Sequence, residues 1–287
     1  MNTSTLYLHI PYCRQACHYC DFHFSTQRST ESALLEAMRN EITLRANQTP
    51  WSGTTLSSLY FGGGTPSFLD TAEIARLIAH AKSLFSFSST IEITLEANPD
   101  DITPEKLEAW HSMGITRLSV GLQSFDDHDL RSMNRAHNAA HSVQCLKWIA
   151  EGPIENYSVD FMYGMPGSSV ESWKDQLDLL ATYLPPHLSC YALTVEEKTV
   201  LHHQINSGET SQPSDEIIVA QFEALRAWAG LHGYTHYELS NFALPNKHSR
   251  HNSHYWSGRP YLGVGPGAHS FDGAQRWWNV SNNTLYA

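Results

Sequence analysis

Three cysteines stand close together near the start of the chain, at Cys13, Cys17 and Cys20, in the spacing C-x3-C-x2-C. The apolar run Leu6–Ile10 comes just before them and predicts a strand, which Pro11 ends. Three thiolates on one short loop can hold three corners of a cubane iron–sulfur cluster. The fourth iron then has no protein ligand, and chemistry at a cluster needs such an open coordination position.

A zinc ion is the alternative interpretation of these cysteines, because a structural zinc site takes four nitrogen or sulfur ligands. His18 or His23 would supply the fourth ligand. Disulfides are disfavoured, since the chain has five cysteines, an odd number, and no signal segment. The other two, Cys145 and Cys190, fall in a helical and a strand pattern, and we expect both to be small buried hydrophobic residues.

The elements that must position these residues alternate between strand and helix patterns up to Thr194, which predicts parallel βα units. The expected strands are Leu6–Ile10, Leu56–Phe61, Ile91–Ala97, Arg117–Gly121, Asn156–Phe161 and Leu188–Thr194. The expected helices are Glu31–Ala46, Thr71–Phe85, one beginning at Thr103-Pro104, Asp126–Arg131, Ala139–Ala150 and Ser172–Tyr183. Six such units predict an α/β fold, a partial (β/α)6 TIM-like barrel, whose functional groups lie at the C-terminal strand ends.

Further residues suited to ligand binding follow these strand ends. The run Gly62–Pro66 (GGGTP) lets a backbone approach a ligand closely, or else forms a tight turn. Glu96 and Asp160 are carboxylates that can accept hydrogen bonds from an amino group or ribose hydroxyls, or lie at the surface. Gln123 offers both a donor and an acceptor. Arg135 can pair with a carboxylate, although a solvated arginine at a helix end is the simpler interpretation.

The last third of the chain has a different pattern. An irregular polar stretch, a helix, a strand and a loop-rich cover for the open side of the barrel are expected at Glu196–Gly208, Ser214–His232, Tyr234–Leu239 and Gly258–Gly273. We therefore expect residues 1–195 to form the barrel core and residues 196–287 to form an α+β accessory extension.

Composition and charge exclude some classes of function. The net charge of −11 argues against broad nucleic-acid binding, which needs a basic face. The sequence has no apolar run that could span a bilayer and no basic-then-apolar signal segment. We expect an acidic, soluble, cytoplasmic protein.

The pattern HIPYCxxxCxYCDF resembles the radical S-adenosylmethionine (radical SAM) superfamily. The ordered motifs HIPYC, GGGTPS, EANPD, GLQSF, NRAH, DFMYGMPG and GVGPGAHS are similar, over nearly the whole chain, to those of the oxygen-independent coproporphyrinogen III oxidase-like family. The resemblance implies a [4Fe-4S] cluster held by Cys13, Cys17 and Cys20, with S-adenosyl-L-methionine on the open iron. It implies that S-adenosylmethionine is contacted by Tyr7, Tyr19, Gly63, Gly64, Thr65, Glu96, Gln123, Arg135, Asp160 and Ala192.

Two branches of that family differ in residues that can be read here. The decarboxylating dehydrogenases carry another cysteine just after the third cluster ligand, whereas this chain has Asp21 and Phe22 there. The HemW-type heme chaperones lack that cysteine and carry H-N-x-x-Y-W, which matches the residues from His251 to Trp256. The resemblance therefore implies a chaperone that carries heme to respiratory-chain hemoproteins, and peripheral membrane association would fit such delivery.

The same resemblance leaves one alternative function open, an enzyme that decarboxylates coproporphyrinogen III oxidatively to protoporphyrinogen IX. It also bears on length. Relatives continue into a small C-terminal domain beyond Ala287, so we expect a shortened form of the protein.

The histidine of the H-N-x-x-Y-W motif has a physical reason to meet heme, since neutral imidazole is a common axial ligand of heme iron. We expect heme contacts at four residues of the motif, namely His251, Asn252, Tyr255 and Trp256. A hydrogen-bonded structural histidine is the alternative for His251, and His254 and His269 are less favoured as ligands. Trp277 and Trp278 are expected to pack against the barrel.

Overall fold

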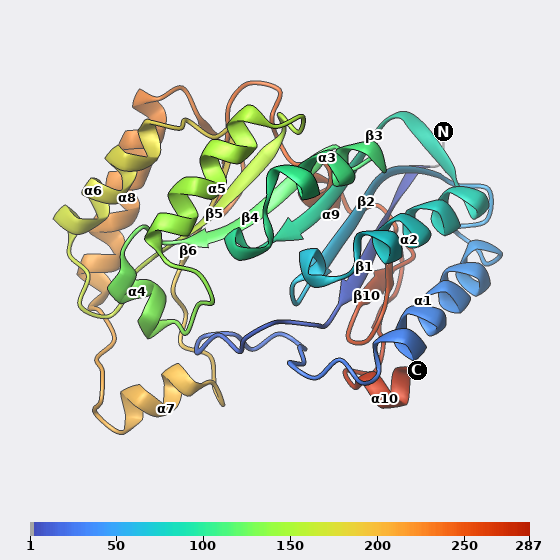
Figure 1. Cartoon of the computed structure of the whole chain (residues 1–287), viewed down its shortest axis with the longest axis horizontal. Coiled ribbons are helices and arrows are strands. Elements are labelled where there is room, and N and C mark those ends of the chain that lie inside the picture. Colours follow the sequence, from blue (N-terminus) through green and yellow to red (C-terminus); the bar gives the residue numbers. More distant parts are fainter. Residues whose placement is uncertain (1–2) are drawn as a thin grey trace.

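One sheet of eleven strands runs through the described chain, residues 3–287, in this computed structural model (Figure 1). In chain order the strands are β1 (Thr3–Ile10), β2 (Thr55–Gly63), β3 (Ser86–Ala97), β4 (Arg117–Gln123), β5 (Tyr157–Tyr163), β6 (His187–Ala192), β7 (Thr235–His236), β8 (Asn241–Ala243), β9 (Tyr261–Val264), β10 (His269–Phe271) and β11 (Arg276–Trp278). Their order across the sheet is β11-β10-β9-β1-β2-β3-β4-β5-β6-β8-β7. The two edges do not pair with each other within residues 3–287, so the predicted partial barrel is confirmed as an open one.

Helices connect the strands, and the longer ones cover the outer face of the sheet. They are α1 (Glu31–Ala46), α2 (Thr71–Leu84), α3 (Pro104–Ser112), α4 (Asp127–Ser132), α5 (Ala139–Glu151), α6 (Val170–Ala181), α7 (Val200–Asn206), α8 (Asp215–Leu231), α9 (Arg250–Trp256) and α10 (Asn283–Tyr286), with 3-10 turns η1 (Pro66–Phe68) and η2 (Pro99–Asp101). Figure 1 shows α7 apart from the other helices, at the end of two long connections. The N-terminus of α3 forms as predicted, because Thr103 accepts a hydrogen bond from Lys106 N and Pro104 occupies the first turn.

The parallel strands have one apolar and one polar face, which is unusual for a parallel sheet. Alternate residues such as Leu6, Leu8 and Ile10 of β1 are buried against the helices in one continuous core. The residues between them point to the inner face, where Tyr7 of β1 is level with Tyr60 of β2. Across the sheet this inner face is mainly polar, and its buried members include Ser58, Glu92, Thr94, Arg117, Ser119, Ser158, His187 and Ser189. A polar inner face suits a binding site better than a packed barrel core.

Strand β9 corrects the expected loop-rich cover at Gly258–Gly273, because it joins the sheet as a seventh parallel strand beside β1. Its apolar residues Leu262 and Val264 are buried in the same core as β1. Between them, Gly263 lets β10 approach so closely that a Cβ there would lie 2.1 Å from the His269 carbonyl oxygen. A four-residue strand set among glycines gives too short an apolar pattern to be recognised in the sequence.

Two other expectations for the last third were inaccurate. The stretch expected to be irregular contains α7, and the strand expected at Tyr234–Leu239 is only the two residues of β7. The HNSHYW motif, for which no element was predicted, forms α9. Strands β7 and β8 extend one edge of the sheet, and β9 to β11 extend the other. Within residues 3–287, no helix has both the length and the apolarity to cross a membrane.

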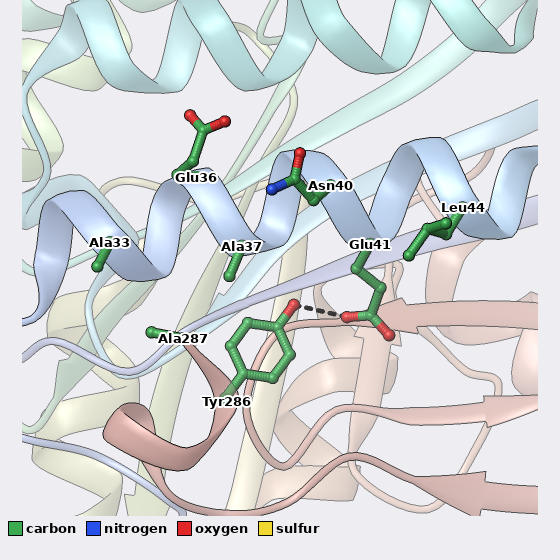
Figure 2. Close-up of a pocket in the computed structure, with 8 residues that line it drawn as sticks. All are labelled: Ala33, Glu36, Ala37, Asn40, Glu41, Leu44, Tyr286 and Ala287. Atoms are coloured by element: carbon green, nitrogen blue, oxygen red, sulfur yellow. Dashed lines mark hydrogen bonds between the residues drawn. The ribbon is translucent and has the colours of Figure 1, made fainter.

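The C-terminal helix α10 packs on α1, and a cavity of about 480 Å³ lies between them (Figure 2). Glu41 of α1 anchors this region, because its carboxylate accepts hydrogen bonds from Tyr286 Oη at 2.6 Å and Asn279 Nδ2 at 2.9 Å. On the other side of α10, the Asn283 Oδ1 and His23 Nε2 atoms are 2.7 Å apart. These contacts hold the end of the described chain against α1 and against the loop between β1 and α1 that carries Cys13, Cys17 and Cys20 (the cysteine loop).

Candidate functional site

A cavity of about 440 Å³ opens at the C-terminal ends of β1 to β6. Apart from Tyr7, the residues that the resemblance assigned to the cluster or to S-adenosylmethionine all line it: Cys13, Cys17, Cys20, Tyr19, Gly63, Gly64, Thr65, Glu96, Gln123, Arg135, Asp160 and Ala192. They come from segments up to 179 residues apart in the chain, counting from Cys13 to Ala192 (192 − 13). The strand ends therefore bring together groups that the sequence only suggested were related.

The cysteine loop forms one wall of the cavity, with three free and partly buried thiols. Two of the thiols have polar neighbours, since Thr65 Oγ1 is 3.5 Å from Cys13 Sγ and Arg135 Nη1 is 3.3 Å from Cys17 Sγ. Burial raises the pKa of Cys13 and the pKa of Cys20 to about 11. Metal ligation by these thiols therefore releases protons.

Arg135 holds the cysteine loop against the strand ends. Its Nη2 donates to Asn98 Oδ1 at 2.7 Å and to the Gly121 carbonyl at 2.8 Å, and its Nη1 lies 3.4 Å from Tyr19 Oη. Its Nε is buried and has no partner among the described residues. The interpretation of Arg135 as a solvated arginine at a helix end is therefore wrong.

The glycine run that follows β2 is required by the protein's own packing. Gly63 has φ = +112°, and a Cβ at this position would lie 2.7 Å from the His9 ring. A Cβ on Gly64 would lie 2.8 Å from the Pro11 carbonyl carbon and 2.9 Å from the Tyr12 carbonyl oxygen. The run thus lets the backbone pack onto the start of the cysteine loop while it lines the cavity.

Glu96 lies at the end of β3, where its side chain faces the cavity. It accepts hydrogen bonds from Tyr60 Oη at 2.8 Å and from Gly63 N at 3.0 Å. Burial, with the nearby charge of Asp160, raises its pKa to about 7 in spite of these two donors. The carboxylate is therefore suited to accept a hydrogen bond from a cationic amino group, which would favour its charged form.

Asp160 lies across the inner face on β5, close to three serine hydroxyls. Ser119 Oγ is 3.2 Å and Ser158 Oγ is 3.4 Å from its carboxylate oxygens, and Ser189 also hydrogen-bonds to it. Burial raises its pKa to about 6. Ser158 also lies 2.8 Å from His187 Nδ1, so a buried hydrogen-bond network continues below the cavity.

Tyr7 is the one predicted cofactor contact that does not line the cavity. Its ring stacks on Tyr60 at 5.9 Å, and its hydroxyl is 3.2 Å from His9 Nδ1, so it supports the wall behind Glu96. Gln123 does line the cavity and has φ = +68°, a left-handed conformation that costs a non-glycine residue about 1 kcal/mol.

Sequence reasoning missed several residues that line this cavity, among them Phe22, Asn98, Ser119 and Tyr191. Asn98 donates to Thr65 Oγ1 at 3.3 Å while its oxygen accepts from Arg135. Its place directly after β3, two residues beyond Glu96, was the signal that could have identified it. Phe22 and Tyr191 are exposed beside the cavity and carried no such signal.

The donor set fits a cubane cluster with S-adenosylmethionine. Within residues 3–287, no three His, Cys, Asp or Glu side chains are gathered as a site for a single metal ion. A cubane bonds each thiolate to a different iron, so its ligands need not converge on one point. Neither His18 nor His23, the proposed fourth ligands for zinc, lines the cavity, whereas the unpartnered Nε of Arg135 lies beside the thiols.

His251, the predicted heme ligand, is buried behind the cavity wall. Its side chain is 1 % exposed, with Nδ1 2.8 Å from Ser58 Oγ and Nε2 3.1 Å from Tyr255 Oη. Its ring stacks on Tyr60 at 4.7 Å, and burial lowers its pKa to about 3. Both ring nitrogens therefore have partners, and the ring is neutral at physiological pH.

The helix that carries His251 begins on the inner face of the sheet. Ser249 caps α9, and Glu92 of β3 accepts hydrogen bonds from the backbone N–H groups of Arg250 and His251 at 3.0 and 3.1 Å. A carboxylate at a helix N-terminus is favourable to the helix dipole. Asn252 is partly buried next to these residues. At the other end of the helix, Trp256 is 63 % exposed.

Comparisons with known proteins agree with this geometry. Residues 7–180 match the family model described as the radical SAM superfamily. The heme chaperone HemW of Mycobacterium tuberculosis is 34% identical over 287 residues, which cover 98% of this chain and 73% of that protein. HemW of Bacillus subtilis is 34% identical over 276 residues, covering 96% of this chain and 72% of that protein.

A solved structure extends the likeness to three dimensions. Coproporphyrinogen III oxidase (HemN) from Escherichia coli, a radical SAM enzyme, superposes with a TM-score of 0.85 at 26% identity. The match covers 99% of this chain and 68% of that chain.

Proposed function

The chain belongs to the radical SAM superfamily and, within it, to the family of the heme chaperone HemW, and we propose that it binds heme and passes it to respiratory hemoproteins. One observation carries this proposal beyond the likeness. His251 of the H-N-x-x-Y-W motif stacks on Tyr60, whose hydroxyl donates to Glu96 in the cofactor cavity. The H-N-x-x-Y-W motif and the cavity thus share one wall, which contains Tyr60.

The cofactor side would be held by residues with distinct tasks. Cys13, Cys17 and Cys20 would each ligate one iron of a [4Fe-4S] cluster, which with S-adenosylmethionine supplies one-electron chemistry when both are bound. Glu96 would accept from the amino group of S-adenosylmethionine, and Asp160 from its ribose hydroxyls. The other predicted contacts, Tyr7, Tyr19, Gly63, Gly64, Thr65, Gln123, Arg135 and Ala192, would shape and close the cavity around the same ligand.

The heme side would use the exposed end of α9. Tyr255 and Trp256 offer aromatic surface to a porphyrin, with Asn252 beside them. His251 would ligate iron only after its Nε2 leaves the Tyr255 hydroxyl, so its first role is to hold that ring in place. The cytoplasm is the proposed compartment, and recipients at the membrane would be reached by peripheral association.

Heme titration of the anaerobically reconstituted protein, followed at the Soret band, tests this function. We expect saturable one-to-one binding, and transfer of the bound heme to an apo-hemoprotein such as apomyoglobin. His251→Ala should weaken binding, whereas His111→Ala, an exposed histidine on α3, should not. Non-saturable binding by the unaltered protein would reject the chaperone function.

The likeness to coproporphyrinogen III oxidase favours a second candidate function, oxidative decarboxylation of coproporphyrinogen III. Asp21 and Phe22 weigh against it, because the extra cysteine of the decarboxylating branch is missing there. Incubation of the reduced, reconstituted protein with S-adenosylmethionine and coproporphyrinogen III separates the two candidates. Protoporphyrinogen IX in the product would establish the enzyme, and its absence alongside heme transfer would support the chaperone.

A further inference from the structure

The inner face of the β10–β11 hairpin carries an aromatic surface that the heme motif does not include. His269 of β10 pairs with Trp278 of β11, and the two rings stack with centroids 5.6 Å apart at 29°. Trp278 is 65 % exposed, so its ring is not part of the core. Its expected packing against the barrel is wrong.

The neighbouring tryptophan shows that this exposure is not a general property of the hairpin. Trp277 points to the other face, where it contacts Trp51 with ring centroids 5.6 Å apart and lies beneath the Arg45 guanidinium. Alternation along the strand thus gives one tryptophan to the core and one to the solvent. An exposed indole beside other aromatic rings is typical of a binding surface.

The aromatic surface continues from the hairpin to the H-N-x-x-Y-W motif. Phe271 of β10 is level with Tyr261 of β9, and their rings are 6.0 Å apart. Tyr261 in turn meets Tyr255 of α9 edge-on at 4.6 Å. Rings on β10, β9 and α9 therefore form one continuous row beside the exposed Trp278.

Two polar side chains on this surface have the chemistry that heme needs. His269 is exposed, and within residues 3–287 its ring has no hydrogen-bond partner. Partial burial and the charge of Arg276 lower its pKa, which keeps the imidazole in the neutral form that binds iron. Arg276, level with Phe271, is exposed and has no ion-pair partner in the described part of the chain. An unpaired arginine in a protein of net charge −11 is suited to a carboxylate ligand.

We propose that the hairpin surface is a heme-binding site, in which His269 ligates the iron, Trp278 contacts the porphyrin and Arg276 pairs with a propionate. An axial imidazole stands perpendicular to the porphyrin, so Trp278, nearly parallel to His269, meets the porphyrin face with its edge. This inference rests on the proposed heme-binding function and names a different ligand from His251. His251 then serves to position Tyr255 at the other end of the same aromatic row.

Two porphyrins separate iron ligation from ring contact. The unaltered chain, His269→Ala, Trp278→Ala, Arg276→Gln and the control His111→Ala are titrated with ferric heme and with iron-free protoporphyrin IX, both followed at the Soret band. We expect His269→Ala to weaken heme binding about tenfold, the equivalent of about 1.4 kcal/mol. It should also abolish the Soret shift of an imidazole-ligated heme and leave protoporphyrin IX binding unchanged.

Trp278→Ala should weaken both porphyrins by a similar factor, and Arg276→Gln should weaken both most strongly at low salt. Because all three side chains are exposed, we expect these variants to keep the fold, and circular dichroism checks this. Heme binding and spectrum that survive both His269→Ala and Trp278→Ala would overturn the site while leaving the chaperone function intact. Absence of saturable heme binding by the unaltered chain would overturn the function together with the site.

Discussion

Two regions differ in which of their polar groups are accessible. One is the cofactor cavity at the C-terminal ends of β1 to β6, and the other is the α9–hairpin region, made of α9 and the β10–β11 hairpin. In the cavity, the groups with ligand chemistry face open space, and Arg135 Nε, beside the cysteine thiols, has no hydrogen-bond partner within residues 3–287. In the α9–hairpin region, the histidine of the diagnostic motif, His251, is buried with both nitrogens bonded, while His269 and Trp278 face the solvent. From this difference we infer that His251 supports the proposed heme site through Tyr255 rather than by contact with the ligand.

Removing a cysteine breaks the first half of this comparison and has the largest expected effect. Cys17→Ala should abolish stable cluster assembly, because two thiolates cannot hold a cubane beside an open iron. Iron and sulfide analysis after anaerobic reconstitution, with the absorbance of the cluster, measures the loss. Cys190→Ala is the control, since Cys190 is buried on the outer face of β6, away from the cavity. Equal iron content in both variants would show that Cys17 is not a cluster ligand.

The cavity was predictable from the sequence for a physical reason. Most of its groups lie at or just after the end of a strand, and parallel strands must end at the same edge of the sheet. Glu96 after Ile93 and Leu95, and the glycine run after Phe61, are two examples. Arg135 was harder to place, because no local pattern shows that its side chain reaches back to Cys17 and Gly121.

The α9–hairpin region could not be derived in the same way. Strand β9 is recognisable only through its long-range pairing with β1. Helix α9 is short, and its first N–H group donates to Glu92, which lies 158 residues earlier in the chain. The exposure of Trp278 depends on which face of β11 meets Trp51. Contacts of this range determine burial, and a single sequence carries no local signal of them.

Stability measurements sharpen the contrast between the two histidines. His251→Ala should lower the free energy of unfolding by about 2–3 kcal/mol, because it leaves a cavity beside Tyr60 and removes the partners of Ser58 and Tyr255. His269→Ala should change it by less than about 0.5 kcal/mol, as expected for an exposed side chain without hydrogen bonds. Urea unfolding of the apoprotein measures both. Similar losses in the two variants would contradict the supporting role of His251 and the free state of His269.

A last prediction concerns Glu96, which contacts Tyr60 between the two regions. Its pKa in the folded state is about 7, above the ordinary value of 4.5, so the folded state binds more protons between these two pH values. Stability from this group is complete below about pH 4.5 and is lost as the pH rises through about 7. Glu96→Gln keeps an oxygen to accept from Tyr60 and Gly63 but does not titrate.

The unfolding free energy of Glu96→Gln relative to the unaltered chain should therefore rise by about 1–3 kcal/mol between pH 5 and pH 8, at about 1.4 kcal/mol per pKa unit and less where water reaches the cavity. Urea unfolding of both apoproteins at the two pH values gives this difference, and other titrating groups cancel. A parallel pH dependence would mean that Glu96 is already charged near pH 5. The contact between the two regions would then depend on the Tyr60–His251 ring stack alone, and the charge of Glu96 would not affect it.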